Sequence, residues 1–155
     1  MAQKQKREEI TTFSLDTSVL ISHLSGDRFV EETDSFLGRA IAQKKRLVIP
    51  DVVYADIYTG IFLAPEPKAE EARVQSLLRV NGVEVRTSRS LKVAKRAGEL
   101  YSKVLKKGMG SPDRIIPDLL IAAQAEATSQ AFVTWNEADY KDLGLSIPVL
   151  TPTKA

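Results

Sequence analysis

The sequence predicts an α/β fold in which a short parallel sheet carries helices on both faces. Segments whose apolar residues recur at helical spacing alternate along the chain with short strand-like segments. The strand-like segments are continuous apolar runs, which are typical of strands buried on both faces. Ligands bind such sheets beyond the carboxyl ends of the strands, so the residues that follow each strand are candidates for a functional site.

The N-terminal half predicts two strands, each followed by a helix. Residues 12–15 form the first strand candidate, and apolar side chains recur at helical spacing over 29–43. The run Leu-Val-Ile at 47–49 predicts the second strand. A helix is expected over 52–63, with Asp51 as its N-cap.

The C-terminal half continues this alternation. A helix over 69–79 is followed by an Asn-Gly turn and a strand at 83–85. A long helix over 91–106 has an apolar stripe along one side, and an alanine-rich apolar segment predicts a buried helix over 119–127. The remaining expected elements are a strand at 131–134, a short helix at 137–143 and an edge strand at 148–150.

The composition narrows the chemistry open to this chain. Its 155 residues, 43% of them hydrophobic, are enough for one compact domain with a core. The absence of cysteine excludes disulfides, thiol catalysis and zinc sites that need a thiolate. A single histidine, His23, excludes mechanisms that need two imidazoles, and we expect it to be structural. Catalysis would therefore depend on hydroxyls, lysines or carboxylates.

The charge is nearly balanced, with 22 Lys and Arg against 20 Asp and Glu and a net charge of +2, so it does not by itself identify a nucleic-acid-binding protein. Residues 1–10 are polar and predict a flexible tail, and 11–155 predict a single domain. No segment has the apolar length needed to cross a bilayer, and the N-terminus does not resemble a signal peptide. We therefore expect a cytoplasmic protein with no membrane partner.

Four aspartates fall where a parallel sheet places its ligand site. Asp16 ends the first strand, Asp56 lies one turn into the helix after the second, Asp118 begins the alanine-rich helix, and Asp139 follows the fourth strand. Asp16, Asp118 and Asp139 each have a structural explanation, namely a turn, a helix-terminal acid and a surface position. Asp56 is harder to explain in this way, because on a helix it shares a face with Val52, Val53 and Gly60, where an aspartate is seldom buried without a partner. Together the four aspartates would repel one another unless a divalent cation neutralised them. Oxygen ligands alone favour Mg²⁺ or Mn²⁺, ions that support phosphodiester hydrolysis.

The segments FSLDTSVLI, IPDVVYADIYTGIF, IPDLLIAAQA and AFVTWNEADY, in this order, resemble the PIN-domain ribonucleases, and most closely the VapC-type toxins of toxin–antitoxin pairs. The resemblance extends from about Phe13 to Pro152. It implies a PIN-like three-layer sandwich with an acidic pocket that binds Mg²⁺ or Mn²⁺ and cleaves single-stranded RNA. It also implies a cognate VapB-type antitoxin and a homodimer that packs through the helices near 29–41 and 52–62.

The resemblance also implies a role for each acidic residue. Asp16, Asp118 and Asp139 match the metal-binding acids, and Asn136 matches a polar ligand position. Asp56 completes the catalytic set but stands where the family usually carries glutamate. Its side chain is one C–C bond shorter, so we expect it to act through water.

Hydroxyl groups beside these acids match positions that orient waters or ligands in the family: Thr17, Ser18 and Thr134. Candidates for contact with RNA phosphates are basic, although a solvated charged surface explains the lysines better: Arg114, Lys103, Lys106 and Lys107. Trp135 is expected to pack beside the site. The alternative function is an RNA-binding or scaffold module of the PIN fold, whose site the shorter Asp56 has weakened.

Overall fold

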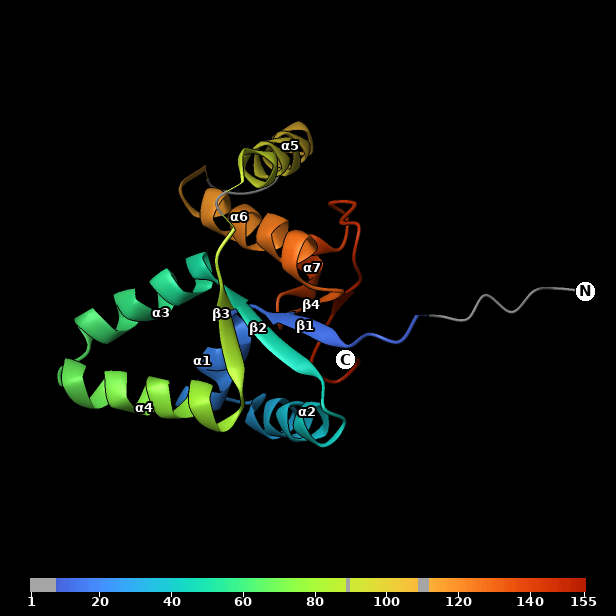
Figure 1. Cartoon of the computed structure of the whole chain (residues 1–155). Coiled ribbons are helices and arrows are strands. Elements are labelled where there is room, and N and C mark those ends of the chain that lie inside the picture. Colours follow the sequence, from blue (N-terminus) through green and yellow to red (C-terminus); the bar gives the residue numbers. More distant parts are fainter. Residues whose placement is uncertain (1–7, 89, 109–111) are drawn as a thin grey trace, which may run out of the picture.

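The computed structural model describes residues 8–88, 90–108 and 112–155, the side chains of 112–116 excepted (Figure 1). The first seven residues of the predicted tail lie outside this range. The strands form a single parallel sheet in the order β3-β2-β1-β4-β5. Their bounds are β1 Thr12–Leu15, β2 Arg46–Pro50, β3 Val83–Arg86, β4 Ala131–Val133 and β5 Val149–Leu150. The predicted parallel sheet is therefore confirmed.

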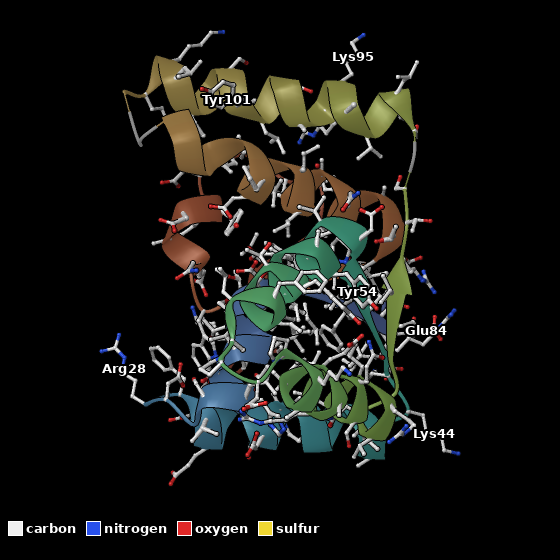
Figure 2. The ribbon with its side chains drawn as sticks, turned by 90° about the vertical axis from the view of Figure 1, so that its left-hand side faces the viewer. Arg28, Lys44, Tyr54, Glu84, Lys95 and Tyr101 are labelled. Atoms are coloured by element: carbon white, nitrogen blue, oxygen red, sulfur yellow. The ribbon has the colours of Figure 1, made fainter. Side chains whose placement is uncertain are left out.

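Helices cover both faces of this sheet, as the apolar strands predict. Helices α5 and α6 lie on one side, and α1, α2 and α4 lie on the other (Figure 1). Helix α5 is outermost, with Lys95 directed away from α6 (Figure 2). The helices are α1 Thr17–Ser25, α2 Val30–Ala42, α3 Asp51–Leu63, α4 Pro67–Val80, α5 Leu91–Lys106, α6 Pro112–Thr128 and α7 Glu137–Tyr140.

The core lies where the central strands meet these helices. Residues of β1, β2 and β4 are buried on both faces, since successive side chains point to opposite sides of the sheet. Phe13 of β1 packs edge-to-face on Phe36 of α2, with ring centroids 5.5 Å apart. None of the helices in the described part of the chain is long and apolar enough to span a membrane.

Two helices differ from the sequence prediction. Helix α1 was not predicted, and it begins directly after Asp16, which occupies its N-cap position. Helix α6 begins at Pro112, so Asp118 lies inside the helix and not at its start. A proline lacks the N–H of an interior helical bond and so suggested a boundary at Pro117, yet the helix continues through it. Pro112 stands at the first helical position, where the missing N–H removes no bond.

The predicted cap of α3 is also wrong. Pro50 occupies the N-cap position, and Asp51 is the first residue of the helix. The Asp51 carboxylate accepts a hydrogen bond from a side chain of α6 and does not cap its own helix. An acid in the first turn still interacts favourably with the helix dipole.

Candidate active site

Asp16 lies at the carboxyl end of β1, and only 4% of its surface is exposed. Its backbone N–H donates to the carbonyl oxygen of Val133 in β4 over 2.9 Å. Its Oδ2 accepts hydrogen bonds from Thr134 Oγ1 at 2.8 Å and from Ser18 Oγ at 3.0 Å. Burial raises the pKa of Asp16, the hydrogen bonds from Thr134 and Ser18 oppose the rise, and the charge of Asp56 adds to it. The net pKa is raised, so this carboxylate favours a neighbouring positive charge.

The predicted hydroxyl residues lie around this carboxylate. Ser18 Oγ accepts the backbone N–H of Trp135 at 3.1 Å, and Thr134 Oγ1 accepts that of Asn136 at 3.0 Å. The backbone of Thr17 also donates to Asp16. The Thr17 hydroxyl is buried and has no hydrogen-bond partner among the described residues, so it can still bind a water or a ligand.

The four predicted aspartates lie within electrostatic range of one buried phenol, that of Tyr140. Tyr140 is 3% exposed and packs edge-to-face on Phe132. Burial raises its pKa, and the negative charges of four carboxylates raise it further: Asp16, Asp118, Asp139 and Asp56. Charges act on a common group only at short range, because solvent and salt screen them over distance. Acids from the end of β1 and from α3, α6 and α7 therefore lie on the same side of the molecule as this phenol.

Asp56 and Asp118 line one cavity of about 570 Å³ between α3 and α6. The other lining residues are Val52, Ala55, Thr59, Pro117 and Ile121. Asp56 also lines a second hollow of about 270 Å³, which includes Ile57, Gly60 and Arg73. Both aspartates are exposed to solvent, in contrast to Asp16. The acidic region is therefore open to a ligand through the cavity between α3 and α6.

The donor set fits a hard divalent cation in its chemistry, because it consists of carboxylate, amide and hydroxyl oxygens. No group of three histidine, aspartate or glutamate side chains in the described ranges is placed to hold one ion directly. Mg²⁺ commonly retains several waters and binds one or two carboxylates, so the spacing fits an ion held partly through water. The unpartnered Thr17 hydroxyl beside Asp16 fits such a hydrated site.

The remaining predicted residues lie at the edge of this region. Asn136 is exposed, and its backbone carbonyl accepts the N–H of Asp139 at 3.0 Å. The Nζ atoms of Lys103 and Lys107 donate to the backbone carbonyls of Leu143 and Asp142, at 3.3 and 2.8 Å. These two lysines therefore bind the segment that follows α7. Lys106 is exposed on α5, and the side chain of Arg114 lies outside the described residues.

Trp135 packs against the protein, as expected. Its ring stacks on Phe29 with centroids 4.3 Å apart, and its Nε1–H donates to Thr33 Oγ1 at 2.9 Å. His23 also has a structural partner, since its Nδ1 lies 2.5 Å from Asp34 Oδ1.

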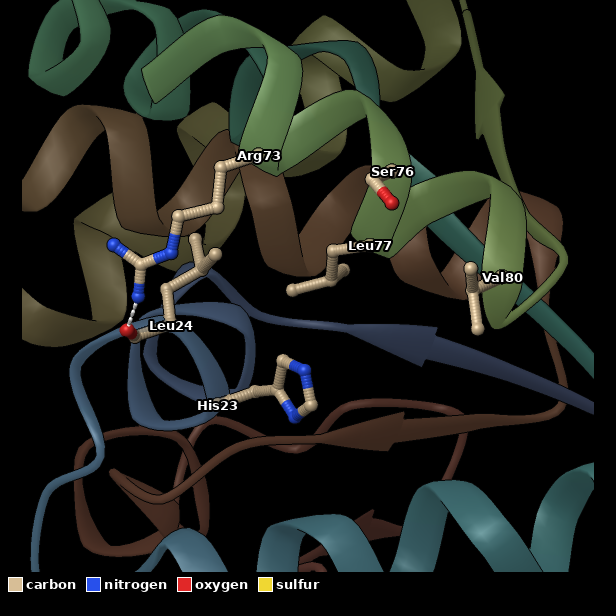
Figure 3. Close-up of a pocket in the computed structure, with 6 residues that line it drawn as sticks. All are labelled: His23, Leu24, Arg73, Ser76, Leu77 and Val80. Atoms are coloured by element: carbon tan, nitrogen blue, oxygen red, sulfur yellow. Dashed lines mark hydrogen bonds between the residues drawn. The ribbon is translucent and has the colours of Figure 1, made fainter. Parts of the chain in front are cut away.

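A further cavity of about 340 Å³ lies beside His23, between α1 and α4 (Figure 3). There Arg73 reaches from α4 to donate a hydrogen bond to the backbone carbonyl of Leu24. None of the four predicted aspartates lines this cavity. It shares Leu24 and Arg73 with the smaller hollow that Asp56 lines, so it lies next to the acidic region without containing its carboxylates.

The sequence prediction missed one polar contact close to the acids. Gln124 of α6 is 5% exposed, and its Nε2 donates to Asp51 Oδ1 at 2.6 Å. The available signal was a glutamine inside an alanine-rich apolar helix, because a buried polar side chain usually has a partner. The sequence does not show which residue that partner is.

Comparison with known proteins supports the same fold. A family model for the PIN domain matches residues 14–144. Among curated proteins, none matches the chain.

Several solved structures share the fold at low sequence identity. A chain of VapBC2 from Rickettsia felis, bound to a DNA fragment from their promoter, is 21% identical, with a TM-score of 0.71 over 90% of this chain and 98% of that one. A chain of VapBC-1 from nontypeable Haemophilus influenzae is 18% identical, with a TM-score of 0.72 over 92% and 99%. A chain of FitAcB from Neisseria gonorrhoeae is 19% identical, with a TM-score of 0.66 over 90% and 97%.

Proposed function

Because the chain belongs to the PIN domain family, we propose that it is a Mg²⁺- or Mn²⁺-dependent endoribonuclease that cleaves single-stranded RNA. The observation that carries this proposal is the buried Asp16 carboxylate at the carboxyl end of β1 together with the cavity that Asp56 and Asp118 line, because parallel folds bind ligands at this end of the sheet. Repulsion among these carboxylates would be relieved by a divalent cation.

The residues that would hold the ion are Asp16, Asp118, Asp139 and Asn136, partly through water. A bound ion would supply positive charge for the phosphate and make a water molecule more acidic. Asp16 is the fixed member of this set, because Thr134 and Ser18 hold its Oδ2.

Asp56 has a different part in this proposal. It lines the same cavity as Asp118, and its exposed carboxylate can accept a hydrogen bond from water or substrate there. In this position Asp56 orients the attacking water and accepts its proton. The RNA phosphodiester would enter the same cavity, where it meets both carboxylates.

We further propose that the chain acts as the toxin of a VapBC-type pair, with a cognate antitoxin that covers the acidic region. Support comes from its fold relatives, which include chains of VapBC complexes and a toxin–antitoxin complex from Klebsiella pneumoniae. A homodimer would form through α2 and α3. These helices leave apolar side chains exposed, with exposed fractions of 47% for Ile41, 72% for Phe62 and 81% for Leu63.

Cleavage of a labelled single-stranded RNA tests the enzymatic part of this proposal. The purified chain, free of any antitoxin, should cut the RNA with Mn²⁺ or Mg²⁺ and not with EDTA, and Asp16→Asn should abolish the cutting. A wild-type chain that binds the RNA but never cuts it would favour the RNA-binding or scaffold alternative. Cutting that persists in Asp16→Asn would assign the activity to a contaminant.

A further inference from the structure

One hydrogen bond joins the two helices that carry Asp56 and Asp118. Gln124 Nε2 of α6 donates to Asp51 Oδ1 of α3 over 2.6 Å. Along their helices, Asp51 precedes Asp56 and Gln124 follows Asp118, in each case by about a turn and a half. The contact therefore lies close to both carboxylates without involving either of them.

The cavity between α3 and α6 makes this contact important for the spacing of the two helices. Val52, Asp56 and Thr59 line it from α3, and Pro117, Asp118 and Ile121 line it from α6. The cavity separates part of α3 from part of α6, so fewer atoms of the two helices are in van der Waals contact there and close packing fixes their separation less firmly. A short hydrogen bond to a carboxylate is among the stronger polar contacts in proteins, and it can set that separation from one end.

The surroundings of Gln124 indicate a role beyond stability. Its neighbours Ile121, Ala122, Ala123 and Ala125 are all buried. Its Oε1 is buried without a hydrogen-bond partner among the described residues. An unpaired buried acceptor is unfavourable, and an apolar side chain of similar shape can be as stable. What the polar pair supplies beyond stability is a defined distance between α3 and α6.

We propose that Asp51 and Gln124 are positioning residues that set the distance between Asp56 and Asp118. This inference rests on the proposed function, since it assigns the two carboxylates to one metal-dependent site. Neither Asp51 nor Gln124 contacts the substrate in this account. They act by keeping α3 and α6 at a separation that suits the ion and the phosphate.

Four variants test the contact. Asp51→Ala removes the acceptor of the hydrogen bond. Gln124→Glu also breaks the bond, because it places a second carboxylate against that of Asp51 and the two repel. Asp51→Asn keeps the acceptor, and the double variant Asp51→Asn/Gln124→Glu restores the bond with its donor and acceptor exchanged. The readouts are the Mn²⁺-induced rise in Tm and the Mn²⁺ concentration that gives half-maximal RNA cleavage. Asp51→Ala and Gln124→Glu should reduce the cleavage rate by about 10- to 100-fold and raise the Mn²⁺ concentration needed for half-maximal cleavage. Asp51→Asn and the double variant should give values close to those of the wild type.

Gln75→Leu is the matched control, because it also removes a glutamine side chain that donates hydrogen bonds to α3, but away from the cavity. Gln75 Nε2 of α4 donates to Tyr54 and Tyr58 of α3, at 3.2 and 3.0 Å. This variant should lower Tm and leave the Mn²⁺ requirement unchanged. If Asp51→Ala behaves like this control, the contact is only structural and the inference is wrong, even though the wild type is metal-dependent. A wild-type chain that neither binds Mn²⁺ nor cuts RNA would overturn the proposed function and the inference with it.

Discussion

Thr134 Oγ1 donates a hydrogen bond to Asp16 Oδ2 over 2.8 Å, and the two residues are 118 positions apart in the sequence. The bond joins the carboxyl ends of β1 and β4, which are adjacent in the sheet. Thr134 is fully buried, so its hydroxyl is held in place by the surrounding core. A buried carboxylate with such a fixed donor has a defined orientation before any ligand binds.

Removing this donor should weaken the site without removing a carboxylate. We expect Thr134→Val to lower RNA cleavage by about 10- to 100-fold, because Asp16 loses its shortest hydrogen bond to a side chain. Thr134→Ser keeps the hydroxyl and should retain most of the activity. Initial cleavage rates for both variants give the comparison, and a Thr134→Val variant as active as the wild type would show that the hydrogen bond does not matter.

The raised pKa of Asp16 predicts the pH dependence of stability in the absence of metal. The folded chain holds this proton more tightly than the unfolded chain, whose value is about 3.8. The contribution of Asp16 to the free energy of unfolding therefore falls as pH rises above 3.8 through the folded pKa. Asp16→Asn removes this loss, so the variant should become more stable than the wild type towards neutral pH and match it in acid. Urea unfolding of both proteins across this range measures the difference.

The contribution of Glu126 to the free energy of unfolding should depend on pH in the opposite direction to that of Asp16. The burial of Glu126 raises its pKa, but the hydrogen bonds from Arg96 and Ser146 and the charge of Arg96 outweigh this, so the net pKa lies below the ordinary 4.5. The carboxylate accepts Arg96 Nε at 2.9 Å and the backbone N–H of Ser146 at 2.7 Å. Its stabilisation is therefore present above pH 4.5 and is lost as pH falls through the folded pKa.

We expect Glu126→Gln to lower the free energy of unfolding by about 1–2 kcal/mol at neutral pH. The difference from the wild type should disappear in acid. The same urea unfolding experiment gives the result, and a difference that stays constant with pH would show that the charge of Glu126 does not contribute.

Asp56 stands where the sequence resemblance leads us to expect glutamate, and restoring the glutamate tests the effect of the shorter side chain. Asp56→Glu lengthens the side chain by about 1.5 Å, the length of one C–C bond, towards the cavity that Asp118 also lines. We expect this variant to cleave RNA at least as fast as the wild type, whereas Asp56→Ala should lower the rate by about 100-fold or more. A slower Asp56→Glu would mean that the pocket is built around the shorter side chain.

The sequence predicted the parallel sheet because the buried strands are uninterrupted apolar runs, and it placed Asp16 and Asp139 after strands for the same reason. Helix α1 was missed because Thr17 and Ser18 also suit a turn. The start of α6 was misplaced because Pro117 suggested a helix boundary. In these cases local residue preferences were overridden by packing against the rest of the chain.

The contacts that orient the acids depend on pairs of residues far apart in the sequence. A threonine after a strand does not indicate which carboxylate it will meet, and the Asp16–Thr134 bond exists only once β1 and β4 are paired. The Asp51–Gln124 bond likewise depends on how α3 and α6 pack. Composition and spacing identify such residues as polar and near the site, and the tertiary structure identifies their partners.

Thermal unfolding with increasing Mn²⁺ tests the central claim, that Asp16, Asp118 and Asp139 belong to one metal-binding site. We expect Mn²⁺ to raise the Tm of the wild type, and we expect Asp16→Asn, Asp118→Asn and Asp139→Asn each to lose this response. Asp142→Asn is the control, since this exposed aspartate is not one of the predicted metal-binding acids and does not line the cavity between α3 and α6, and it should keep the response. A Tm that does not change with Mn²⁺ in the wild type, or that rises equally in all the variants, would contradict the account.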